Sequence, residues 1–229
     1  MKFDIITIFP RIFDSYFSES ILARAQKNKL IQIKIHNLRD WAADKHKSVD
    51  DSPYGGGAGM VLMAQPVIKA VDNIIKEKKT KEVVFSAKGK QFNQKMDYDW
   101  SKKLDQVIMI AGRYEGIAES VMKILKAEEV SVGPYVLTDG EVPAMTVVSA
   151  VSRLIPGVIK LESLKEESHW NLLLKNEALR PAQDKGEGLE YPHYTRPEVL
   201  EYKGKKYKVP KVLLSGDHKK IEEWRKNAK

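Results

Sequence analysis

Arg113-Tyr-Glu-Gly116 and, soon after it, Ser131-Val-Gly-Pro-Tyr-Val-Leu-Thr-Asp-Gly-Glu-Val-Pro-Ala144 are the stretches that decide the fold. An apolar, β-rich run at 107–111 precedes the first stretch, and another at 129–132 precedes the second. Each run stops at a glycine, which lets the backbone approach a ligand closely. In open α/β sheets, ligands bind beyond the carboxyl ends of the strands. Two such strand ends that carry Gly, Glu and Tyr therefore predict one shared pocket.

Strand and helix patterns alternate through most of the chain before residue 160. Hydrophobic patterns predict strands at 2–8, 30–35, 82–85, 107–111 and 129–132, and helices at 11–27, 65–76, 117–125 and 142–152. The polar segment at 92–104 is also predicted to be a helix. Alternation of this kind predicts an α/β fold with a parallel sheet and right-handed crossovers. The predicted helix at 142–152 has no charge and many small residues, so it fits packing either under the sheet or against a partner subunit.

The composition is that of an ordinary globular protein. With 229 residues, of which 42% are apolar and 31% charged, the chain can bury one medium core, and we expect a second, small domain. No apolar run reaches the length of a membrane span, and Asp4 interrupts the first apolar stretch, unlike a cleavable signal. The absence of cysteine excludes disulfides and thiolate zinc sites, so we expect a cytoplasmic protein.

The net charge of +8 and the pI of about 9.3 favour a polyanionic partner, with nucleic acid as the leading candidate. The composition changes after Pro156-Gly157, and from residue 191 to the end Lys and Arg exceed Asp and Glu by six. This asymmetry predicts a small basic lobe that grips nucleic acid. For any single cluster, lysines that keep the surface soluble are the simpler explanation.

A glycine-rich segment, Gly-Gly-Gly-Ala-Gly at 55–59, must form a loop. Free amides in such loops can cradle phosphates, but this one lacks the Gly-Lys-Ser/Thr ending of a nucleotide P-loop. On composition alone, a flexible turn is slightly favoured over a phosphate-binding loop.

Taken together, the motifs resemble the bacterial tRNA (guanine-37-N1)-methyltransferases of the SPOUT superfamily. The resemblance covers nearly the whole chain and rests on Ile5–Pro10, Val49–Met60, Gly112–Gly116, Val132–Ala144, Ser152–Gly157 and Tyr191–Leu200. No single stretch would suffice, because glycine loops and Pro-Gly turns are common. The resemblance implies a SPOUT-type parallel sheet with a C-terminal trefoil knot in residues 1–160. It also implies a linker at 161–176 and a small, mainly helical, basic tRNA-binding domain at 177–229.

The family binds S-adenosylmethionine in three knotted loops, which correspond here to 85–89, 112–116 and 132–140. The cofactor-binding residues that the resemblance implies are Phe85, Ser86, Ala87, Gly89, Gly112, Glu115, Val132, Gly133, Pro134, Tyr135, Val136, Leu137 and Gly140. Among these, apolar Phe85, Val132 and Leu137 would cover the adenine ring.

The implied reaction is methylation of N1 of guanosine 37 in tRNA anticodon loops, with a preference for guanosine at both positions 36 and 37. Because the sulfonium already activates the methyl group, the protein must position N1 and remove its proton. Arg153 matches the family's catalytic arginine in Ser-Arg-Leu-Ile-Pro-Gly and would stabilise charge at O6. Glu167 is the candidate base, where the family has Asp. Glu166 is an alternative base. A further alternative is that neither acid is catalytic and that both only keep a linker solvated.

The resemblance also implies partners. Asp50, Arg113, His193 and Arg196 correspond to residues near the guanine and the anticodon loop. The family is an obligate homodimer with shared active sites and no membrane association. It benefits from Mg²⁺, but the sequence shows no dedicated carboxylate cage, so we assign no metal ligands and expect any ion to be shared with RNA.

Some positions depart from the family's pattern. Ala118 and Pro134 stand where Asp is frequent, and Asp139 replaces a glycine, which predicts an altered loop because side chains disfavour positive φ. Two other functions therefore stay open. One is a related SPOUT methyltransferase with a different RNA target. The other is an RNA-binding homologue with weakened catalysis, suggested by the Glu-for-Asp change and by the chain's end soon after Trp224-Arg225.

Overall fold

The computed structural model describes residues 1–166, 168 and 191–228. The chain divides into two compact units, residues 1–161 and 162–229, and each is described by itself. The expected linker at 161–176 falls largely outside the described residues.

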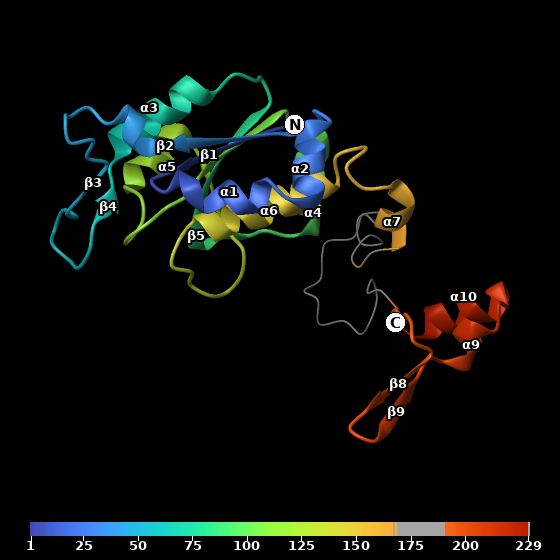
Figure 1. The fold of residues 1–229 in the computed structure, drawn as a ribbon. Coiled ribbons are helices and arrows are strands. Elements are labelled where there is room, and N and C mark those ends of the chain that lie inside the picture. Colours follow the sequence, from blue (N-terminus) through green and yellow to red (C-terminus); the bar gives the residue numbers. More distant parts are fainter. Residues whose placement is uncertain (167, 169–190, 229) are drawn as a thin grey trace. The chain divides into compact units, whose positions relative to one another are not determined.

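A five-stranded parallel sheet forms the centre of the first unit (Figure 1). Its strands are β1 (Lys2–Thr7), β2 (Gln32–Asn37), β5 (Thr80–Gln91), β6 (Gln106–Ile110) and β7 (Glu128–Ser131), in the order β2-β1-β6-β5-β7. Every residue of the central strand β6 is buried, as expected for a parallel strand with both faces covered. The predicted α/β fold with a parallel sheet is confirmed.

Helices cover both faces of the sheet (Figure 1). One face is covered by α1 (Asp14–Phe17), α2 (Ser20–Lys27), α4 (Gln94–Lys103) and α6 (Glu141–Arg153), and the other by α3 (Ala64–Ile74) and α5 (Glu119–Leu125). Because side chains alternate along a strand, Ile5 of β1 packs in the first layer and Ile6 in the second. Both residues are at most 1% exposed.

The predicted single helix at 11–27 is wrong. This segment is split into the 3₁₀ turn η1 (Pro10–Phe13), α1 and α2. The break falls at Ser18-Glu19-Ser20, where Glu19 is extended and Ser20 has a φ of 53°. Serine competes with helical hydrogen bonds and favours caps and turns, so the chain redirects there.

The predicted short strand at 82–85 is also wrong in length, because β5 runs on to Gln91 with an irregularity between Phe85 and Lys90. Val130 of β7 pairs with both of these residues. At Gly89 a Cβ would lie 2.6 Å from the backbone of Val130, so only glycine lets the two strands lie this close. The irregularity lifts the residues between Phe85 and Gly89 out of the ladder.

Two smaller features complete the first unit. A short 3₁₀ turn, η2 (Leu38–Trp41), follows β2. The antiparallel pair β3 (Asp50–Asp51) and β4 (Val61–Leu62) encloses the glycine-rich loop at its base.

The second unit contains helices and a β-hairpin. Its elements are α7 (Leu161–Glu166), which begins at the boundary, the hairpin strands β8 (Val199–Tyr202) and β9 (Lys205–Lys208), and the helices α9 (Lys211–Leu214) and α10 (His218–Asn227). The two hairpin strands pair antiparallel, with Val199 opposite Lys208 and Tyr202 opposite Lys205. Ring contacts between Tyr194 and Trp224 join the segment before the hairpin to α10. None of the helices in the described ranges is long and apolar enough to span a bilayer.

Candidate functional site

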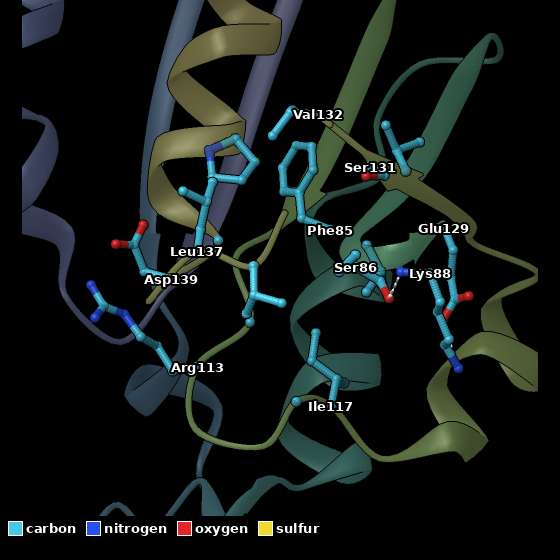
Figure 2. Close-up of a pocket in the computed structure, with 18 of the residues that line it drawn as sticks. Phe85, Ser86, Lys88, Arg113, Ile117, Glu129, Ser131, Val132, Leu137 and Asp139 are labelled. Atoms are coloured by element: carbon cyan, nitrogen blue, oxygen red, sulfur yellow. Dashed lines mark hydrogen bonds and ion pairs between the residues drawn. The ribbon is translucent and has the colours of Figure 1, made fainter. Parts of the chain in front are cut away.

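A cavity of about 540 Å³ opens at the carboxyl ends of β6 and β7 and at the irregular middle of β5 (Figure 2). Residues 84–88, 112–117 and 135–140 supply most of its wall, with further residues from α5, β7 and the start of α6. This is the place at which the sequence predicts a shared pocket. Its volume lies in the range of sites for small molecules and cofactors.

Most of the residues expected to bind a cofactor line this cavity. They are Phe85, Ser86, Ala87, Gly112, Glu115, Val132, Tyr135, Val136, Leu137 and Gly140. The exceptions are Gly89, Gly133 and Pro134, which do not line it. Gly89 instead allows the close approach of β5 to β7, and a side chain at Gly133 would overlap the Tyr135 ring. These two glycines therefore shape the wall without forming it.

The apolar part of the wall comes from segments far apart in the sequence. Figure 2 shows Phe85, Val132, Leu137 and Ile117 around the same hollow. Sequence reasoning missed Ile117 and also Met122, which lies on α5. The helical spacing of apolar residues indicated only a core role for Ile117 and did not include Met122, because the direction in which α5 leaves the sheet is not visible in the sequence.

The charged part of the wall is acidic. The lining contains Glu115, Glu119, Glu129 and Asp139 against Lys88 and Arg113, so four acids face two bases and the wall has a formal charge of −2 in a chain of +8. Burial of a cationic ligand is favoured by such a wall.

Lys88 lies between two of these acids. Its Nζ is 3.3 Å from Glu129 and 3.5 Å from Glu119, and the hydrogen bond to Glu129, followed by the charges of both acids, raises the pKa of Lys88. Its side chain is largely exposed, so these pairs contribute little to stability.

Two glycines bring two walls of the cavity together. The Gly140 amide donates a hydrogen bond to the Gly112 carbonyl at 2.9 Å. A Cβ on Gly140 would lie 2.6 Å from the Gly112 nitrogen and 2.7 Å from the Cα of Ala111. The segment before α6 therefore runs directly against the segment after β6, with no room for a side chain between them.

The glycine-rich loop adjoins the cavity through Glu115. The Glu115 amide donates to the Met60 carbonyl at 3.0 Å, and a Cβ on Gly59 would lie 2.7 Å from the Glu115 carboxylate. Gly59 also has a φ of 78°, which favours glycine. The loop's last residues are thus fixed against the cavity wall, whereas a Cβ added at Gly55 or Gly56 would meet no atom within 4 Å.

Arg113 forms part of a buried charge cluster beside the cavity. Its Nε lies 2.9 Å from Glu141, but their relative angle is outside hydrogen-bond geometry, so charge attraction rather than a directed bond joins them. The guanidinium also lies 4.8 Å from the centre of the Phe9 ring. Thr7 donates a hydrogen bond of 2.5 Å to the other oxygen of Glu141. Burial raises the pKa of Glu141, and the Thr7 bond and the Arg113 charge only partly oppose it.

Asp139 takes its place in the loop without the backbone strain of a positive φ. Asp139 is not among the residues with positive φ. Its Oδ1 accepts a hydrogen bond from the Val142 amide at 2.9 Å and thereby caps the start of α6. Partial burial acts to raise the pKa of Asp139, but the bonds from Val142 and Thr138 outweigh it and the pKa is lowered.

Arg153 is the last residue of α6, whereas Pro143 at the helix start lines the cavity. Twelve residues at a rise of about 1.5 Å place Arg153 about 18 Å along the helix from its first residue. The α4 residue Asp97 lies within reach of the Arg153 charge. Asp97 is 1% exposed, and burial raises its pKa to about 7 although the charge of Arg153 opposes the shift.

The remaining candidates lie elsewhere. Asp50 is in β3 at the base of the glycine-rich loop. His193 and Arg196 are exposed in the second unit, where His193 contacts the ring of Tyr191 at 4.7 Å. Glu167 lies outside the described residues. Within the described ranges no cluster of three or more His, Asp or Glu is arranged to hold a metal ion.

Comparison with known proteins gives a consistent match. The family model described as "tRNA (Guanine-1)-methyltransferase TrmD" matches residues 1–229. A relative from Thermomicrobium roseum is 48% identical over 99% of this chain and 78% of its own length. Relatives from Ruminiclostridium cellulolyticum (48% identical, 98% of this chain, 89% of its own) and Clostridioides difficile (45%, 99% and 91%) are similar. All three are named tRNA (guanine-N(1)-)-methyltransferase.

Proposed function

The chain belongs to the tRNA (guanine-1)-methyltransferase family. From this membership we propose the roles of its cavity, of α6 and of its second unit in the reaction. Its activity is methylation of guanine N1 in tRNA, which implies S-adenosylmethionine as the methyl donor. The target that we propose is guanosine 37 of the anticodon loop, preceded by guanosine 36.

We place the cofactor in the 540 Å³ cavity. The observation that carries this assignment is the combination of an apolar wall with an excess of acids in a basic chain. The apolar side chains suit the adenine ring, and the acids suit the ribose hydroxyls and the positive charge of the sulfonium. Bound there, the cofactor supplies an activated methyl group. The family's knotted topology is part of the proposal.

Two side chains would act on the guanine. Arg153 stabilises the negative charge that develops at O6 when N1 loses its proton. Glu167 accepts that proton, with Glu166 as the alternative. Both acids follow α6 in the chain, at or just beyond the end of α7.

We propose a homodimer in which each cavity is completed by Arg153 of the partner subunit. Two observations support it. Arg153 lies about 18 Å along α6 from the helix end that lines the cavity, beyond the reach of its own side chain. Large apolar side chains are also exposed just before η1, on η1, on α1, on the cavity loop and at the start of α6: Phe9, Ile12, Tyr16, Val136 and Val142. Exposed apolar groups of this kind mark subunit contacts.

We propose that the second unit binds tRNA, with His193 and Arg196 near the anticodon loop. Asp50 and Arg113 of the first unit would lie near the guanine. The proposed domains are 1–160 for the cofactor, 161–176 as linker and 177–229 for tRNA. Since tRNA is the substrate, a cytoplasmic location is part of the proposal. Mg²⁺ has no assigned ligands, and any requirement for it would reflect ions shared with RNA.

The proposal is tested with labelled S-adenosylmethionine and an anticodon stem-loop that carries guanosines at positions 36 and 37. We expect N1-methylguanosine at position 37. Glu167→Gln should abolish transfer and leave the affinity for S-adenosylhomocysteine, measured by calorimetry, unchanged, whereas the matched Glu166→Gln should retain transfer. Retained turnover in Glu167→Gln would remove the base assignment. Binding of the stem-loop without any transfer by the wild type would instead favour an RNA-binding homologue.

A further inference from the structure

The β8–β9 hairpin of the second unit is exposed along its whole length. All eight residues of the two strands are exposed. The register pairs Leu200 with Tyr207 and Tyr202 with Lys205. Because side chains alternate along each strand, these four residues share one face, which we call the tyrosine face.

The tyrosine face is apolar and aromatic. Tyr202 is 59% exposed, Tyr207 54% and Leu200 54%. The two tyrosines are diagonal cross-strand neighbours, which places their Cα atoms about 7–8 Å apart. The opposite face carries Val199, Glu201, Lys206 and Lys208 and has no aromatic ring.

Positive charge surrounds the tyrosine face. The hairpin, residues 199–208, contains four lysines and one glutamate, which gives it a formal charge of +3. Lys203 in the turn lies with its Nζ 5.4 Å from the centre of the Tyr202 ring, so a cation borders the ring.

Exposure of the tyrosine face to water is unfavourable for the stability of the hairpin, and a bound partner would cover it. A two-stranded hairpin with both faces in water is marginally stable, and three large apolar side chains on one exposed face add to that cost. Aromatic rings bordered by lysines are the combination that binds unpaired nucleotides, because bases stack on the rings while phosphates meet the cations. A charge of +3 also disfavours docking to the equally basic second copy of this unit.

We propose that the tyrosine face stacks unpaired loop nucleotides of the tRNA substrate, while Lys203 and Lys205 contact the adjoining phosphates. This inference rests on the proposed function in one respect only, the identification of the RNA as the tRNA substrate. The contact involves residues that take no part in the methyl transfer.

Full-length chains are compared for tRNA affinity at several salt concentrations. The variant Tyr202→Leu/Tyr207→Leu keeps apolar bulk and removes the rings, and we expect it to lower the affinity about tenfold or more without changing the salt dependence. Tyr202→Phe/Tyr207→Phe keeps the rings and should bind as the wild type does. Lys203→Gln/Lys205→Gln should lower both the affinity and the slope of log affinity against log salt, by about one unit for each phosphate that the variant no longer neutralises. Val199→Ala on the opposite face is the matched control and should have no effect.

The affinity for S-adenosylhomocysteine, measured in each variant, checks that the first unit is intact. Full tRNA affinity in Tyr202→Leu/Tyr207→Leu, or an equal loss in Val199→Ala, would overturn the proposal. A loss of self-association instead of RNA affinity would also overturn it. Wild-type chains that bind tRNA through the tyrosine face yet transfer no methyl group would contradict the proposed function and not this contact.

Discussion

The amide of Gly140 donates to the carbonyl of Gly112 at 2.9 Å, and a Cβ on Gly140 would lie 2.6 Å from the Gly112 nitrogen. Two wall segments of the cavity, separated by a complete helix and strand in the sequence, are therefore in backbone contact. This contact fixes the distance between the two loops to which we assign the cofactor.

Gly140→Ala should consequently destabilise the chain and weaken cofactor binding. The methyl group would meet backbone atoms that cannot move without displacing the sheet, so we expect a loss of about 2–3 kcal/mol in the free energy of unfolding. Denaturant unfolding and calorimetry with S-adenosylhomocysteine measure the two effects. Gly112→Ala is the control for the stability measurement, because its Cβ would lie 3.4 Å from the flexible Ile117 side chain and should be far less destabilising. Equal effects of the two substitutions would contradict this account.

Arg113→Met should be strongly destabilising. It leaves the fully buried Glu141 without its cation, which costs about 3–5 kcal/mol. Adding Glu141→Gln should recover part of that loss, and the double-mutant cycle measures the coupling. Lys88→Met, which removes an exposed pair at the same cavity, should cost less than about 1 kcal/mol. Additive effects of Arg113→Met and Glu141→Gln would show that the two side chains are not coupled.

Asp139→Asn tests the cap of α6. The pKa of Asp139 is lower in the folded chain than in the unfolded chain, so ionisation stabilises the fold at neutral pH and this stabilisation is lost as the pH falls through the folded pKa. The variant should therefore be less stable than the wild type at pH 7. On acidification below about pH 4, the variant should lose less stability than the wild type does. Melting temperatures from pH 3 to 7 measure both. Parallel curves for variant and wild type would exclude the ionised cap.

Asp97→Asn tests the buried carboxyl in α4. Burial raises the folded pKa of Asp97 to about 7, so the folded chain retains the proton to a higher pH than the unfolded chain does. The favourable contribution exists below the unfolded pKa and is lost as the pH rises through about 7. Relative to the wild type, Asp97→Asn should become progressively more stable as the pH rises from about 4 to about 7, by up to about 4 kcal/mol in total, and the difference should level off above pH 7. A stability difference that does not vary across this range would show that Asp97 is ionised throughout.

The sheet and the position of the cavity could be predicted from the sequence because both rest on local patterns. The apolar runs before Gly112 and Gly133 are long enough to be strands, and a glycine at each end marks the edge where ligands bind. The helix at 142–152 was recognised by its lack of charge, and α6 extends it by one residue at each end.

What could not be predicted depends on contacts between distant residues. Thr7 and Glu141 are 134 residues apart, and nothing near either position indicates their hydrogen bond. Asp97 belongs to a helix that was predicted from a polar pattern, and its burial arises only because α4 packs against α6. The capping role of Asp139 was missed because comparison with a glycine drew attention to backbone strain and away from the carboxylate's ability to accept a hydrogen bond.

The most direct test of the shared active site is subunit complementation. One variant, Arg153→Ala, keeps an intact cavity, and the other, Leu137→Arg, blocks the cavity and keeps Arg153. Each alone should be inactive in methyl transfer to tRNA. If Arg153 acts on the partner's cavity, mixed dimers contain one complete site, and an equal mixture reassembled from unfolded chains should recover about a quarter of the wild-type activity. A mixture as inactive as its two components would show that Arg153 serves its own chain's cavity or none, and would contradict the account.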